Sequence, residues 1–159
     1  MTTNITYVLN AKWRVKLTPR PDAWQVSPVK DGHNAWRNDP GAIRPFPVPE
    51  EIDASVPGCL HTDLIAAGVI KDISIDGKEQ DQFWIWKTDS EYFTTIKQDA
   101  RAGNKTLVFH GLDTICKVLI NGVLKLEAKN MHRSYRIDIT DELTKGDVEI
   151  RVDRKSTRL

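Results

Sequence analysis

The chain has 159 residues, 40% of them hydrophobic, and five tryptophans, which is enough apolar material for the core of one domain. Lys and Arg number 23 against 22 for Asp and Glu, so the summed charge would not gather a nucleic-acid backbone or an anionic membrane surface, and we expect neither partner. The first ten residues lack the charged start and apolar centre of a secretory signal, and no apolar run approaches the roughly 20 residues that span a bilayer, so the sequence predicts a cytoplasmic protein.

The first predicted element is a strand over residues 13–17, where apolar and polar residues alternate as in a strand with one buried face. Residues 18–49 hold most of the eight prolines and several turn signals, and they predict a long irregular segment. A short strand is then predicted over residues 52–56. Residues 59–68 place their apolar side chains on one helical face and end at Gly68, which predicts a short helix.

Aromatic and β-branched runs predict the remaining strands. These runs cover residues 83–87, 92–97, 105–110, 115–120, 123–127, 134–139 and 148–152. Asn121 and Gly122 separate two of the runs and form the pair that a two-residue type I′ hairpin turn favours. Many short strands, one short helix and no alternation of strands with helices predict a mainly β protein, an antiparallel β-sandwich or jelly roll. We expect this domain to cover residues 1–153 and a linker or cut end to cover residues 154–159.

The two cysteines, Cys59 and Cys116, lie far apart and belong to no CxxC or Cys/His cluster, so their spacing indicates neither a zinc site nor a redox pair. We expect two free thiols, each buried or half-buried. The metal-binding spacings HxH and HExxH do not occur in the sequence. We therefore expect no metal and no cofactor.

Several polar residues could be grouped into a site, but we favour structural roles for them. His61 and Asp63 lie at the start of the predicted helix and could be paired with His110 or His132. We expect instead that Asp63 favours the positive end of the helix dipole and that His61 hydrogen-bonds a nearby loop.

Two further polar residues are interpreted as architectural. Asp113 is expected to accept backbone N–H groups in a tight connection over residues 111–114, and Asn130 is expected to cap or bridge a loop. Neither residue is assigned a catalytic role.

An ordered series of motifs resembles a known enzyme family. VPGCLHTDL over residues 56–64, followed by AGVIKD over residues 67–72, resembles the segment VPGxxHxDLxxxGxIxDP that opens β-mannosidases of glycoside hydrolase family 2. The resemblance covers residues 52–152 and continues through Trp84-Ile85-Trp86, Tyr92, residues 109–114, the VxLNG-like hairpin of residues 118–122, Asn130-Met131 and residues 135–143. Ile73, Ser74 and Ser90 depart from the pattern, since the family has a proline, an aromatic residue and a tryptophan there.

The resemblance implies a galactose-binding-like jelly roll that packs against a later immunoglobulin-like domain and a (β/α)₈ barrel. A retaining glycosidase needs two carboxyl groups about 5 to 5.5 Å apart, and the resemblance places both in that barrel. It implies a non-catalytic domain that supports the barrel and borders its β-mannoside cleft. The partners it implies are the carbohydrate, through the longer enzyme, and the domains that follow in the same chain.

The polar residues of the loop over residues 72–82 are the candidates for contact with that cleft. They could hydrogen-bond sugar hydroxyls at the rim, although a solvated charged loop is the more common situation. Trp84 and Trp86 are predicted to share one face of a strand, where a ring could stack on a sugar, and we expect at least one of them in the core. The candidate rim residues are Asp76, Glu79, Gln82 and Trp84.

Two alternatives stay open. The chain could be a free-standing carbohydrate-binding module with an exposed aromatic residue, or an independent hydrolase, for which the sequence offers no recognisable carboxylate pair. The accessory-domain hypothesis further predicts an uncovered apolar or aromatic patch where the other domains would pack.

Overall fold

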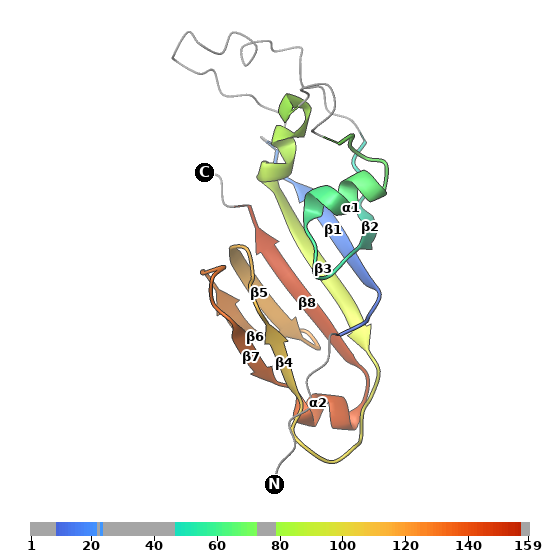
Figure 1. Cartoon of the computed structure of the whole chain (residues 1–159), viewed down its shortest axis with the longest axis vertical. Coiled ribbons are helices and arrows are strands. Elements are labelled where there is room, and N and C mark those ends of the chain that lie inside the picture. The colour runs from blue at the N-terminus through green and yellow to red at the C-terminus, as the bar shows by residue number, and fades with distance from the viewer. Residues whose placement is uncertain (1–8, 22, 24–46, 73–78, 157–159) are drawn as a thin grey trace.

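The computed structural model describes residues 9–21, 23, 47–72 and 79–156. Eight strands, two α-helices and a 3₁₀ helix are found in these residues (Figure 1). The strands are β1 (Trp13–Pro19), β2 (Glu51–Ala54), β3 (Thr88–Ile96), β4 (Thr106–Phe109), β5 (Ile115–Ile120), β6 (Val123–Ala128), β7 (Tyr135–Asp138) and β8 (Val148–Lys155). The helices are α1 (Leu60–Ala66), α2 (Thr140–Lys145) and the 3₁₀ helix η2 (Glu79–Lys87). Most of the proline-rich segment lies outside the described residues.

Every strand pairing in the described residues is antiparallel, which confirms the predicted fold class. A six-stranded sheet has the order β2-β1-β3-β8-β5-β6, and β4 pairs with β7 in a second, two-stranded sheet. Figure 1 shows β4 and β7 beside β5 and β6, whereas α1 lies at the β1–β2 side of the large sheet. None of the helices in these residues is long and apolar enough to cross a membrane.

The core divides into two clusters because different elements cover the two halves of the large sheet. In one cluster Val118 and Ile150 of the large sheet pack with Ile137 of β7 and Leu143 of α2. The other cluster contains Val15 of β1, Leu64 of α1 and Trp84 of η2. β1 alternates buried and exposed residues along its length, as its sequence pattern predicts.

The predicted strand over residues 83–87 is wrong, because this segment forms the end of η2. Its aromatic and β-branched residues favour a strand only in the context of a sheet, and here Trp84 and Ile85 pack into a core cluster instead. The hydroxyl of Thr88 donates a hydrogen bond to the carbonyl of Trp84 at 2.9 Å, as in a helical turn. In a 3₁₀ helix, with about three residues per turn, residues two apart point in different directions. Trp84 is accordingly 0% exposed and Trp86 42% exposed, and the prediction that they share a face is also wrong.

The prediction of one short helix is likewise corrected by α2 and η2. The residues of α2 follow a predicted strand directly and contain two threonines and only one leucine, a composition that gives little helical signal. β8 continues to Lys155, so the sheet includes the first two residues of the expected linker.

The Asn121–Gly122 turn between β5 and β6 is confirmed. Both residues have positive φ, 49° and 78°. The turn is also joined to the start of β8, since the Asn121 side-chain oxygen accepts a hydrogen bond from Glu149 N at 2.8 Å and Asn121 N donates to Glu149 O at 2.9 Å.

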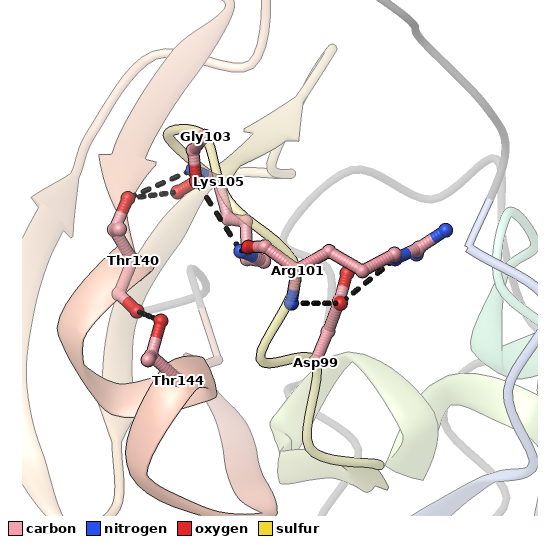
Figure 2. A network of polar contacts seen from close by, with 6 residues as sticks. All are labelled: Asp99, Arg101, Gly103, Lys105, Thr140 and Thr144. Atoms are coloured by element: carbon pink, nitrogen blue, oxygen red, sulfur yellow. Dashed lines mark hydrogen bonds and ion pairs between the residues drawn. The ribbon is translucent and has the colours of Figure 1, made fainter.

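A polar network joins the β3–β4 connection to α2 (Figure 2). Thr140 Oγ1 accepts a hydrogen bond from Lys105 N at 2.8 Å, and the Lys105 ammonium donates to the carbonyl of Arg101. Arg101 also pairs with the Asp99 carboxylate, at 2.8 Å from Nε. Within α2, Thr144 donates from its hydroxyl to Thr140 O at 2.6 Å. These contacts provide hydrogen-bond partners for backbone N–H and C=O groups of an irregular connection, and they hold α2 at this end of the sandwich.

Candidate functional site

The four candidate rim residues do not form one exposed group. Asp76 lies outside the described residues, and Glu79 is the first residue of η2. Gln82 is 6% exposed, and its Nε2 donates to Lys71 O at 2.9 Å, which ties η2 to the segment after α1. Trp84 is fully buried. The side chains of Gln82 and Trp84 are therefore inside the domain and offer no surface to a sugar, because η2 turns them into the core.

Trp86 is an exposed aromatic residue of η2, and the period-two pattern missed it. The pattern that could have indicated it is the three-residue spacing of buried Gln82 and Ile85, which fits a 3₁₀ helix and leaves Trp86 outside.

Asp63 connects three elements through a buried carboxylate. Its side chain is in the first turn of α1 and the residue is 3% exposed. Oδ1 accepts a hydrogen bond from Ser55 N at 2.9 Å and Oδ2 accepts one from the Tyr92 hydroxyl at 3.2 Å. Burial, followed by the nearby Asp63 charge, raises the pKa of Tyr92 well above its usual range. The predicted position of Asp63 at the helix start is confirmed, whereas its two partners were not predicted.

The histidines do not assemble a metal site in the part of the chain that the structure describes, where no three His, Cys, Asp or Glu side chains are grouped. His61 is partly buried, and burial and then the Arg154 charge lower the pKa of its imidazole. The expected hydrogen bond from His61 to a loop is not found among the described residues. His110 and His132 are exposed.

Both cysteines are free, as predicted, but only Cys116 is buried. Burial is the main cause that raises the pKa of Cys116 to about 11, so its thiol stays protonated at neutral pH. Cys59 is exposed, which corrects the prediction for this residue. It precedes α1 as the N-cap, where the Thr62 hydroxyl donates to Cys59 O at 2.7 Å.

The connection from β4 to β5 lies against the loop after β6. The Asp113 carboxylate accepts a hydrogen bond from the Thr114 hydroxyl, rather than from the backbone N–H groups that were predicted. Asn130 Oδ1 accepts one from His132 N at 2.9 Å, which confirms the predicted loop-bridging role. A Cβ at Gly111 would lie 2.8 Å from Met131 O, so the two loops approach each other as closely as a glycine allows.

Three large apolar side chains lie exposed around the end of β8, and we call them the end patch: Trp86, Ile115 and Met131. Ile115 pairs with Lys155 in the sheet, and Thr114, the residue before it, contacts the Met131 sulfur at 3.9 Å. The hydroxyl of Ser156, directly after β8, donates to the Trp86 carbonyl. Each of the three side chains is 42% to 44% exposed. Figure 1 shows that β8 ends, and β5 begins, at this end of the sheet.

The outer face of the large sheet has a different character, because its charges are paired with one another. Arg151 Nη1 lies 2.7 Å from the Glu91 carboxylate, and Arg151 Nε lies 2.8 Å from that of Glu149. Lys155 Nζ lies 3.2 Å from both Asp89 and Asp153. These ion pairs suit contact with water along β3 and β8.

Comparison with known proteins identifies the family. The sequence profile described as "Glycosyl hydrolase 2 galactose-binding domain-like" matches residues 24–159. Beta-mannosidase B of Aspergillus terreus is 38% identical over 103 residues, which cover 63% of this chain and 12% of the relative. The beta-mannosidase of Capra hircus is 38% identical over 93 residues, which cover 57% of this chain and 11% of the relative. The chain thus spans about an eighth of the length of these relatives.

A solved structure agrees with these sequence matches. The β-D-mannosidase of Dictyoglomus thermophilum superposes with a TM-score of 0.67 and 25% sequence identity, over 94% of this chain and 15% of the other. A β-glucuronidase from an uncultured Clostridium, with a TM-score of 0.51 and 13% identity over 98% of this chain and 24% of the other, shares the fold. The chain therefore belongs to the glycosyl hydrolase 2 galactose-binding-domain-like family and corresponds to the N-terminal domain of β-mannosidase-like proteins.

Proposed function

We propose that the chain is a non-catalytic accessory domain of a longer β-mannosidase-like glycosidase, which acts on β-mannosides. In this proposal it supports the catalytic barrel and borders the carbohydrate cleft. Support comes from the relatives, which are named β-mannosidases and are far longer than this chain. Asp76 and Glu79 stay candidates for the border of the cleft.

The end patch carries the docking part of the proposal. Surfaces that dock a partner domain expose apolar side chains, and Trp86, Ile115 and Met131 are each 42% to 44% exposed near the point where β8 leaves the sheet. A domain that follows β8 in a longer chain would meet this end first.

A single substitution with a matched control tests the docking role in the longer protein. The coding DNA is sequenced past the codon for Leu159, and the longer reading frame is expressed to give that protein. A stop codon directly after Leu159 would contradict the proposal. Ile115→Asp puts a charge into the end patch, whereas Val123→Asp puts the same charge on a residue that is 58% exposed at the opposite end of the sheet. We expect Ile115→Asp alone to lower the Tm of the longer protein by several degrees and to expose the domain junction to proteolysis. Equal effects of the two variants would refute the docking role.

The absence of catalysis is tested directly with this chain. An aryl β-mannoside assay is expected to give no turnover above buffer. Turnover that scales with the concentration of the chain would show that it is itself a hydrolase.

A carbohydrate-binding module is the second candidate, and exposed Trp86 favours it, because indole faces stack on sugar rings. Titration of the chain with mannobiose and mannan, followed by tryptophan fluorescence, tests it. Binding that is lost in Trp86→Ala would support this candidate. No response from either glycan would leave the accessory-domain function as the better account.

A further inference from the structure

Arg154 differs from every other charged residue of β8. The others are ion-paired within the sheet: Glu149, Arg151, Asp153 and Lys155. Arg154 has no carboxylate within ion-pair distance in the described ranges, although the residue is partly buried. A partly buried cation without a counter-charge is costly, and such a charge is normally paired.

The side chain of Arg154 belongs to the inner face of the large sheet. Its Cα pairs with those of Ser90 and Cys116, whose side chains are buried. Arg154 Nε donates a hydrogen bond to Asp113 O at 2.9 Å. This bond orients the guanidinium and leaves its two terminal nitrogens for another acceptor.

The groups around Arg154 respond to its charge. It lowers the pKa of His61, which belongs to α1, and it partly offsets the burial that raises the pKa values of Tyr92 and Cys116. The hydrogen bond to Asp113 O places the guanidinium beside the β4–β5 connection.

Ser90 is a second and independent indication of a missing polar group. It is 2% exposed, and its hydroxyl oxygen has no hydrogen-bond partner among the residues described. Buried hydroxyl groups almost always have one. Ser90 and Arg154 are partners across β3 and β8, so an unpaired hydroxyl and a guanidinium with two free terminal nitrogens occur at the same end of the inner face, which fits an acceptor with more than one oxygen atom.

We propose that Arg154, together with Ser90, forms a binding site for a carboxylate at the end of the inner face. The terminal nitrogens of a guanidinium bind the two oxygens of a carboxylate side by side, which matches the part of Arg154 that Asp113 leaves open. The carboxylate belongs to an Asp or Glu of the polypeptide that follows, a source that rests on the proposed accessory function, or to a small organic acid. Both sources supply the same chemical group, a carboxylate.

The site is tested first in this chain, with acetate as the probe and chloride keeping the ionic strength constant. NMR follows the Nε–H signal of Arg154 and the ring signals of His61. We expect acetate to shift both signals in a saturable way and to bind at least tenfold more weakly to Arg154→Gln. Arg154→Lys should bind acetate with intermediate affinity, because lysine keeps the positive charge but lacks the two side-by-side nitrogens of the guanidinium. Arg154→Lys also keeps the test valid if the neutral variant folds poorly.

Lys155→Gln is the matched control, because it removes the same charge from the next residue, which is ion-paired on the outer face. It is expected to bind acetate as the original chain does. Equal loss in the two Gln variants, or binding that survives Arg154→Gln, would overturn the proposal.

The two sources are separated in a longer protein that contains the following domains. If one of its own side chains fills the site, acetate no longer shifts the Arg154 signal there. If the ligand is a small acid, the acetate response persists. The test in this chain does not depend on the longer protein, so failure of the accessory function would be recognised separately.

Discussion

Tyr92 donates its phenolic hydrogen to the carboxylate of Asp63 across 3.2 Å, which joins the centre of the large sheet to α1. The other oxygen of the same carboxylate accepts a hydrogen bond from Ser55 N, directly after β2. A single buried carboxylate thus connects β2, α1 and β3, and it does so within the VPGCLHTDL segment that carries the family resemblance.

Asp63→Ala is expected to destabilise the domain by roughly 2 to 6 kcal/mol, because it leaves two donors without an acceptor and each unsatisfied buried donor costs about 1 to 3 kcal/mol. Tyr92→Phe removes one of the two bonds and is expected to cost about half as much. Urea unfolding followed by tryptophan fluorescence measures both free energies. A change of less than about 0.5 kcal/mol in Asp63→Ala would mean that the carboxylate is not a structural connection.

Alkaline pH should weaken the domain through Tyr92. The folded state raises the pKa of Tyr92 above its ordinary value of 10. The stability that the protonated phenol contributes is therefore complete below pH 10 and is lost as the pH rises from there toward the folded-state pKa. Between pH 8 and pH 11, the free energy of unfolding should decrease more in the original chain than in Tyr92→Phe. If the free energy of unfolding decreased equally in the two proteins, groups other than Tyr92 would be the cause of the loss of stability.

The sequence allowed most of the sandwich to be predicted, because strands with one buried face show their period directly. β1 and the Asn121–Gly122 turn are clear examples: one shows strict alternation, and the other needs positive φ at both positions. The segment of η2 could not be predicted in this way. Its aromatic residues have strand propensity, but tertiary packing places Trp84 in the core and Trp86 outside.

The candidate site was harder to predict than the fold. The pairing of Asp63 with Tyr92 depends on residues 29 positions apart, and the missing counter-charge of Arg154 is evident only once its neighbours in the sheet are known. Neither relation has a short sequence motif. The rim prediction failed for Gln82 and Trp84 because it assumed a loop and a strand where the chain forms a 3₁₀ helix.

The two thiols should differ strongly in reactivity. At pH 8 the disulfide reagent DTNB is expected to modify exposed Cys59 at once, whereas Cys116, buried and with a pKa raised to about 11, should react only after denaturant is added. Absorbance of the released thiolate counts the thiols in each phase. Cys59→Ser should remove the fast phase alone, and a fast second thiol in that variant would contradict the burial of Cys116.

Gly58→Ala should be one of the most damaging small substitutions in the chain. A Cβ at this position would lie 2.3 Å from the carbonyl oxygen of Ser55, a backbone atom that cannot rotate away as a side chain can. Ser55 is also held at its N–H group by Asp63, so relief of the clash would break that hydrogen bond. We expect a loss of roughly 2 to 4 kcal/mol, in the range that overpacking and the loss of a buried polar contact produce.

Gly146→Ala provides the control for that substitution. Gly146 has an extended φ of 176°, and, its two chain neighbours aside, no atom of the described residues lies within 4 Å of a Cβ built on it. This variant should be neutral, or more stable by about 0.4 to 1 kcal/mol, because alanine has fewer conformations in the unfolded chain. Urea unfolding of the two variants at one pH measures the contrast. If Gly58→Ala were as stable as Gly146→Ala, the turn between β2 and α1 would have to relax without cost, and the Asp63 connection would be weaker than its geometry indicates.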